Sequence, residues 1–238
     1  MPVRDGAYEE LTVHRHSRHT MPSATDVDRS PEARAVAERY LRRERPLTAL
    51  VVVLVVGIFL AAYAVSSLLP AIAVAVVLLV AARAPLLQSR GTIRLRTDDD
   101  PETVAAAFAG PTPPVLALQW GIADNAVPSD GTATYRVSYL LGLRSVEMSV
   151  ETDAERTSDG AHRVDLAVTA NGSAWATYTA MIRPEEKDGG TAVEVTYAAE
   201  RRFGLRRVPQ QLVADRYRDE VLAVQGYDVV ERDAHFGF

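Results

Sequence analysis

The chain has 238 residues, of which 47% are hydrophobic, and it carries a formal net charge of −5 at pH 7. It has no cysteine, which excludes disulfides, thiol catalysis and cysteine metal sites. The acidic C-terminal part lacks the basic face that nucleic-acid binding requires, so no nucleic-acid partner is expected. Lys187 is the only lysine, and this acidic, arginine-for-lysine composition favours a salt-loving, haloarchaeal source.

The first segment, residues 1–29, is polar and without periodicity, and it is expected to be disordered. His14, His16 and His19 have a spacing that could hold a metal ion in a flexible tail. No carboxylate or further histidine is fixed beside them, so a plain polar tail is the expectation, and no metal site or cofactor is predicted.

Residues 30–45 carry the signature of a short helix. Ser30 is a good N-cap, and Pro31 suits the first helical position. Arginines surround one apolar stripe, which predicts a basic amphipathic helix lying on the membrane surface, with a plain solvated helix as the alternative. The stripe consists of Ala33, Val36, Ala37, Tyr40 and Leu41.

The next segment, residues 47–87, is an apolar run whose only charge is Arg83. A single spanning helix needs about 20 residues, and this run is about twice as long. Ser66, Ser67 and Pro70 lie near its middle, where they favour a turn, because proline cannot continue a helix and serine caps exposed backbone groups. The run therefore predicts a two-helix transmembrane hairpin.

Arginines flank both ends of this hairpin and are missing from its tip. By the positive-inside rule, the protein is expected in the cell membrane with two spans and with both termini in the cytoplasm. A buried soluble helical hairpin is the alternative, but neither span has a polar face. The arginines expected to contact the membrane surface are Arg42, Arg43, Arg45, Arg83 and Arg90.

The remaining segment, residues 90–233, is expected to form one cytoplasmic domain. GTIRLRT alternates as a strand does, and Asp100 with Pro101 then starts a helix that GPTPP ends. VLALQWGIA is interpreted as a second strand. A meander of alternating strands follows, with Asn171-Gly172 as a two-residue hairpin turn. A long final helix runs from Pro209 to Gln225, with a short strand after it; its predicted apolar stripe is Leu212, Val213, Tyr217, Val221 and Val224.

This element order resembles that of the START-like superfamily, also called SRPBCC or Bet v 1-like, over about Gly91 to Gln225. The resemblance rests on TIRLRTDDDPETVAAAF as the opening strand and helix, on the meander and on the closing helix. It implies an α+β helix-grip fold, in which a curved antiparallel sheet of about seven strands wraps a long C-terminal helix. GPTPP stands where such proteins have a second short helix that helps form the mouth of a cavity.

The resemblance also implies a cavity between sheet and helix that binds lipids or other apolar ligands. Aromatic side chains expected on the inner face of the sheet are candidates to line it, because tyrosine and tryptophan combine an apolar body with a polar group. The alternative is that they fill the core. The candidates are Trp120, Tyr135, Tyr139, Trp175 and Tyr197.

No catalytic constellation is recognisable. His162 and His235 are not placed as bases, and the acids Asp98 to Asp100 are explained by the start of a helix. The basic segment 201–207 could contact anionic lipid or form a solvated loop. The first hypothesis is a membrane-anchored domain that binds a hydrophobic ligand. The second is a structural or regulatory membrane protein with a filled core, acting through protein partners, and the third is a cyclase- or hydrolase-type enzyme.

Overall fold

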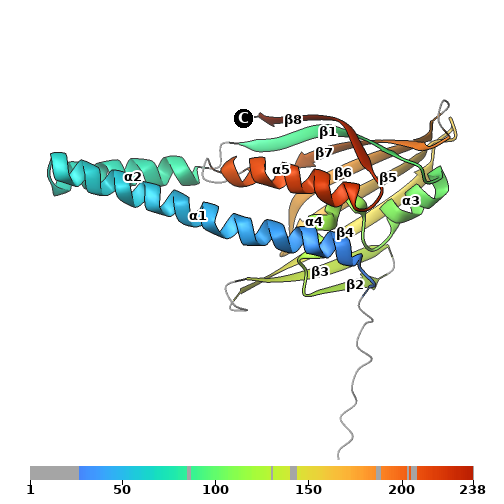
Figure 1. Cartoon of the computed structure of the whole chain (residues 1–238), viewed down its shortest axis with the longest axis horizontal. Helices are drawn as coiled ribbons and strands as arrows, with labels where there is room; N and C mark the ends of the chain where they lie inside the picture. Colours follow the sequence, from blue (N-terminus) through green and yellow to red (C-terminus); the bar gives the residue numbers. More distant parts are fainter. Residues whose placement is uncertain are drawn as a thin grey trace, which may run out of the picture.

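The computed structural model describes residues 27–84, 87–129, 131–139, 144–185, 189–202, 204 and 208–237. Within these residues, two helices form a projecting hairpin, and the rest of the chain forms one α+β domain around an antiparallel sheet (Figure 1). The histidine-containing tail and most of the basic segment 201–207 lie outside the described residues.

The hairpin consists of α1 (Pro31–Val65) and α2 (Leu68–Arg83), which lie side by side. The turn falls at Ser66 and Ser67, where the Ser66 hydroxyl donates to the Ala62 carbonyl at 2.5 Å. Pro70 lies in the first turn of α2, where a missing N–H costs no helical hydrogen bond. Among the described residues, no helix combines the length and apolar character needed to cross a membrane.

The sheet contains eight strands, all paired antiparallel, in the order β2-β3-β4-β5-β6-β7-β1-β8. The sequence predicts about seven; β2 is the strand that it misses, and β8 is longer than expected. The strands are β1 (Gln88–Thr97), β2 (Asn125–Ser129), β3 (Thr132–Tyr139), β4 (Arg144–Arg156), β5 (His162–Ala170), β6 (Ser173–Pro184), β7 (Thr191–Ala199) and β8 (Asp228–Gly237).

Alternating apolar residues place one face of this sheet in the core. The predicted inner residues of β5 and of the middle of β4 are buried, as their period of two requires. The β5–β6 turn has φ of 49° at Asn171 and 71° at Gly172, the left-handed conformation of a type I′ hairpin. The buried inner residues of the two strands are Met148, Val150, Val164, Leu166 and Val168.

Three short helical segments lie between β1 and β2 in the chain. Helix α3 (Pro101–Ala109) begins at Asp100, whose carboxylate accepts from the amides of Glu102 and Thr103, as expected for an N-cap. The 3₁₀ turn η1 (Pro114–Leu116) and α4 (Ala117–Gly121) come next. The predicted second strand at VLALQWGIA is therefore wrong, and these turns supply the second short helix that appeared to be missing.

Helix α1 begins in the domain core and does not lie apart from it. Ala33, Val36 and Ala37 are fully buried, and this part of α1 packs on α4 and on α5 (Val208–Ala223). The stripe expected to face the membrane thus contacts the domain, because α4 and α5 present apolar side chains to it. The same helix continues without a break through Pro46 into the hairpin.

The residues just before α1 are also ordered, so the tail predicted to be disordered through residue 29 is too long. The Arg29 guanidinium is buried and donates to the carbonyls of Trp120 at 3.0 Å and Ala123 at 2.6 Å. These carbonyls lie at the C-terminal end of α4, where a cation is favourable. The Val27 amide donates to the Ala126 carbonyl of β2.

Helix α5 packs against α1, α4, η1 and β8 (Figure 1). Its buried stripe differs in part from the prediction: Tyr217 and Val221 are buried as expected, but Ala214 and Leu222 complete the stripe, and Val224 is exposed. The strand β8 then returns along β1 as the edge of the sheet, which places the C-terminal residues that the sequence left unassigned.

Candidate functional site

A cavity of about 470 Å³ lies between α5, the η1–α4 turn and the inner face of β1, β6 and β7. One side is formed by Val221 and Leu222 of α5, and the other by Ile93 of β1 and residues of β6 and β7. The volume is in the usual range of small-molecule sites. The side chains that the structure describes therefore do not fill the space between the sheet and the C-terminal helix.

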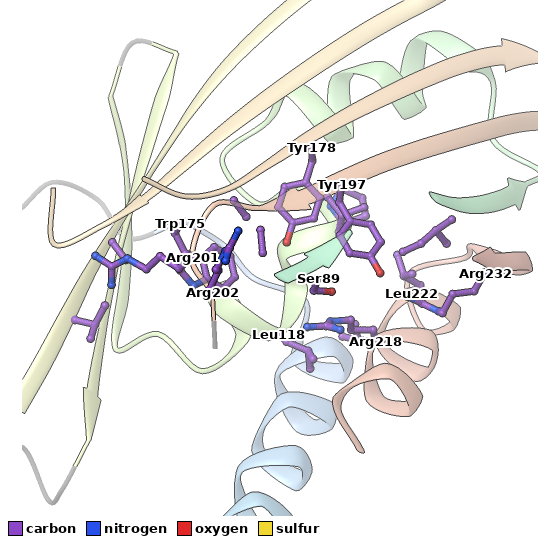
Figure 2. A pocket seen from close by; sticks show the side chains of 18 of the residues that line it. Ser89, Leu118, Trp175, Tyr178, Tyr197, Arg201, Arg202, Arg218, Leu222 and Arg232 are labelled. Atoms are coloured by element: carbon purple, nitrogen blue, oxygen red, sulfur yellow. The ribbon is translucent and has the colours of Figure 1, made fainter. Parts of the chain in front are cut away.

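Three aromatic side chains form the sheet side of the cavity. Tyr178 of β6 and Tyr197 of β7 are cross-strand partners, and their rings stack with centroids 6.2 Å apart (Figure 2). Trp175 lines the cavity further along β6. Together they give the wall an apolar surface with hydroxyl groups at its edge, which suits a ligand with both apolar and polar parts.

Trp175 reaches the cavity through an irregularity in the sheet. Alternation along β6 would put Trp175 and Tyr178 on opposite faces. The register between β5 and β6 shifts by one residue here, because Val168 pairs with Ala176 whereas Thr169 pairs with Ala174. Trp175 is the extra residue of this bulge, and a bulge redirects a side chain.

Gly91 of β1 allows the close approach of neighbours around Tyr197. A Cβ at Gly91 would stand 2.9 Å from the Tyr197 hydroxyl oxygen and would collide with the Asp233 carbonyl of β8. A glycine at this position thus lets β8 pair with β1 while Tyr197 keeps its place in the cavity wall.

Four of the five predicted cavity residues divide into two groups. Trp175 and Tyr197 line the cavity. Trp120 and Tyr135 are fully buried elsewhere: the Trp120 indole donates to the Pro113 carbonyl at 2.9 Å, and the Tyr135 hydroxyl to the Pro111 carbonyl at 2.7 Å. They tie the η1 region to the core, and burial raises the pKa of Tyr135. The side chain of Tyr139, at the end of β3, lies outside the described residues.

Arginines are the polar groups that the sequence reasoning missed. Arg218 of α5 and Arg232 of β8 line the cavity, and Arg201 and Arg202 lie beside Trp175 (Figure 2). Arg218 shares a face of α5 with Val221 and Leu222. Its position three and four residues before these two was the signal that could have found it.

Electrostatics connect Arg218 with the aromatic wall. Burial raises the pKa of the Tyr178 hydroxyl, while the positive charge of Arg218 lowers it and Tyr197 raises it further. The net direction is upward, so the hydroxyl stays protonated at neutral pH and can donate a hydrogen bond.

A second hollow, of about 360 Å³, lies between α1 and α5 and is lined by arginines. Arg42 and Arg43, predicted to contact the membrane surface, line it and are exposed; Arg39 forms an ion pair with Glu220 at 2.6 Å. Arg90 is exposed at the start of β1. The side chains of Arg45 and Arg83 lie outside the described residues.

Metal-ligating side chains do not cluster in the part of the chain that the structure describes. In the acidic run, Asp100 caps α3, as predicted, and the hydrogen bond from the Thr103 hydroxyl lowers the pKa of its carboxyl group. His235 lies at an exposed position beside Asp233, at 3.1 Å. It is not directed into the cavity, whose lining does not include it.

No protein family and no curated protein matches the sequence. Solved structures do match. A Deinococcus radiodurans protein has 19% identity and a TM-score of 0.36, over 57% of this chain and 97% of its own. A START superfamily protein from Mycobacterium smegmatis has 10% identity and a TM-score of 0.37, over 59% and 97%. Ara h 8.0201 has 10% identity and a TM-score of 0.35, over 57% and 99%.

Proposed function

We propose that the protein is a membrane-anchored, cytoplasm-facing domain that binds a lipid-like or other hydrophobic ligand. The observation that carries this proposal is the cavity between α5 and the sheet. Cores of folded proteins are packed to near-crystalline density, so a void of this size beside aromatic side chains is unusual unless something occupies it.

The lining favours an apolar ligand of moderate size. Trp175, Tyr178 and Tyr197 face Val221 and Leu222 across the space. Burial of apolar surface contributes about 25 cal/mol per Å², so a hydrocarbon group that fills this wall gains several kcal/mol. At roughly 30 Å³ for each water-sized unit, the volume holds on the order of 15 non-hydrogen atoms.

The hairpin supports a location at the membrane. Its large apolar side chains are exposed on both helices, for example 65% at Val53, 82% at Leu69 and 66% at Val77. A contiguous exposed apolar surface of this kind marks an interaction site. At 1.5 Å per residue, the apolar stretch of α1 up to Val65 is about 28 Å long and α2 about 24 Å, both shorter than the ~30 Å hydrocarbon core, so the proposed insertion requires a locally thinner bilayer.

The cavity lies near the base of this hairpin. Ser89, in its lining, follows the last residue of α2, Arg83, by only six positions, which can span at most about 21 Å. We infer that the hairpin inserts into the cell membrane with both termini in the cytoplasm, as the flanking arginines favour. A ligand could then pass between bilayer and cavity over a short path.

The open cavity also distinguishes this proposal from its rivals. A structural or regulatory protein with a filled core would not leave this space. An enzyme would gain from charged groups inside it, and Arg218 and Arg232 are such groups. A guanidinium stays protonated in proteins, however, so these arginines suit the binding of an anion better than proton transfer.

Native mass spectrometry with lipid extraction on the full-length protein, purified from its own membranes, tests ligand binding. We expect a stoichiometric small apolar molecule that the Ala199→Trp variant loses, because residue 199 lines the cavity. The matched Ala174→Trp variant, on the exposed side of β6, should retain it. Equal retention in both, or a protein free of ligand, would favour a partner-binding protein.

The anchoring is tested separately with reporter fusions. A reporter inserted at Ser67, in the turn of the hairpin, should be accessible from outside the cell, and one fused after Phe238 only from inside. The opposite result, or extraction of the protein by carbonate without detergent, would contradict an inserted hairpin.

A further inference from the structure

We propose that the ligand is an acidic amphiphile, a hydrocarbon chain with one carboxylate or phosphate group, and that Arg232 and Arg218 bind its anionic head. This inference rests on the proposed function, since it names the class of molecule that occupies the same cavity. It is based on the arginines in the cavity wall, because a purely apolar ligand offers them neither a negative charge nor a hydrogen-bond acceptor.

Arg232 is the main group in this proposal. It projects from the inner face of β8, opposite Ile93 of β1, and its side chain is only 14% exposed. Its Nη2 bonds to the Asp219 carboxylate. Its Nε and Nη1 are buried, and neither has a hydrogen-bond partner within the described part of the chain.

Two guanidinium nitrogens whose N–H groups lack acceptors are costly inside a protein. A buried donor without a partner costs about 1–3 kcal/mol, and more for a charged group. A planar guanidinium can accept a second oxyanion on the donors that the first leaves unused, because it has five N–H groups in a fixed fork. A carboxylate or phosphate at this end of the cavity would place an acceptor beside Arg232 that Nη1 could reach, whereas the Nε–H points from a different edge of the guanidinium and would not share the same anion.

Arg218 adds a second cation to the same wall. It lies one turn before Val221 and Leu222 on α5, and its Nη1 contacts the Asp215 carboxylate at 2.5 Å. Its charge acts on Tyr178, whose hydroxyl points toward the side of the cavity where Ser89 and Arg218 lie (Figure 2). The guanidinium groups of Arg218 and Arg232 and the tyrosine hydroxyls of the sheet therefore line the same cavity.

The charge balance favours an anion over a neutral or cationic head. Four arginines line the cavity, namely Arg201, Arg202, Arg218 and Arg232, whereas its lining has no acidic residue among those described. The two carboxylates in contact with these arginines, Asp215 and Asp219, lie behind them on α5. This is a local excess of positive charge in a protein whose net charge is −5.

The orientation of the ligand follows. The head group lies by Arg218 and Arg232, where Leu222 also borders the space. The hydrocarbon chain extends past the stacked Tyr178 and Tyr197 toward Trp175.

The test is a competition on the delipidated full-length protein in micelles. An equimolar mixture of decanoic acid, decyl phosphate and decan-1-ol is added, and native mass spectrometry measures which ligand is bound. The three share one chain, so they differ only in the head group. We expect the two anions to exceed the alcohol by at least tenfold, and their ratio to each other identifies the carboxylate or phosphate source.

Variants assign this selectivity to the site. Arg232→Gln should reduce the preference for the anions about ten- to hundredfold, the value of hydrogen bonds to a charged group, and leave binding of the alcohol unchanged. Asp219→Asn removes the carboxylate that competes for Arg232, so it should raise anion affinity about three- to tenfold. A misfolded variant could not produce that gain.

Controls separate the possible failures. Arg156→Gln, in an exposed pair with Glu102, should behave as wild type. A preference that disappears in Arg42→Gln and persists in Arg232→Gln would place the anion in the α1–α5 hollow and overturn the inference. Equal binding of acid and alcohol would overturn it too, while leaving the proposed function intact. Binding of none of the three would contradict both.

Discussion

The contact between α1 and α4 makes a sharp prediction, because the two helices approach closely at Gly121. A Cβ at this position would stand 2.8 Å from the Cβ of Ala37. Carbon atoms pack at about 3.5–4.0 Å, so the Gly121→Ala variant must push α1 outward by about 1 Å. Overpacking of this kind costs about 1–3 kcal/mol of unfolding free energy.

A second substitution should relieve the strain. Ala37→Gly alone loses a buried methyl group, about 0.8 kcal/mol, and about 1 kcal/mol of helix propensity. In the double variant, the new methyl of residue 121 occupies the space that residue 37 vacates. We therefore expect the double variant to be about 2 kcal/mol more stable than the sum of the single effects predicts.

Urea unfolding of the full-length protein in micelles measures these effects, with fluorescence from Trp120, the neighbour of Gly121, as the signal. Ala107→Gly on the exposed face of α3 is the matched control, since it has the same helix cost and should be additive with Gly121→Ala. Additive effects of Gly121→Ala and Ala37→Gly would refute the close packing of α1 on the domain.

Three further outcomes are expected. Tyr135→Phe removes the bond to the Pro111 carbonyl and should cost about 1 kcal/mol in urea unfolding, whereas the same change at exposed Tyr63 should cost nothing measurable. Gly91→Ala should displace β8 and lower ligand occupancy in native mass spectra while Gly57→Ala, in open surroundings, does not. Burial, together with Asp99, raises the pKa of Tyr227 from its ordinary value near 10 to about 12. The contribution of Tyr227 to the free energy of unfolding is therefore complete below pH 10 and decreases toward pH 12, because in this range the tyrosine loses its proton in the unfolded chain but keeps it in the folded protein. Tyr227→Phe should flatten this part of the pH–stability curve.

The regular parts of this fold were predictable because one face of each element is buried and the other is not. The strands β4 and β5 alternate cleanly, and Asn171-Gly172 fixes the turn between β5 and β6. The η1–α4 segment does not have one buried and one exposed face, and its structure was predicted wrongly. Leu116, Leu118 and Trp120 alternate as in a strand, but all three are buried among α1, α5 and the sheet, so their spacing carries no information about the period.

The cavity was predictable in place and only partly in composition. Trp175 and Tyr197 were found because aromatic residues stand out in a sequence. Tyr178 was not, because a bulge that puts it on the same wall as Trp175 leaves no local mark in the chain. Arg232 was missed because β8 reaches β1 from the far end of the chain, and only the register between them brings the guanidinium to the cavity.

Because α1 runs without a break from the domain into the hairpin, it fixes the direction in which the hairpin faces relative to the domain. Each residue of a helix turns the chain by about 100° and advances it 1.5 Å. One residue inserted after Arg43 would thus rotate the apolar hairpin by about 100° around the domain, while seven inserted residues would nearly restore its facing at a distance about 10 Å greater. The number of residues in α1 between the domain and the hairpin therefore determines the direction in which the cavity opens relative to the hairpin.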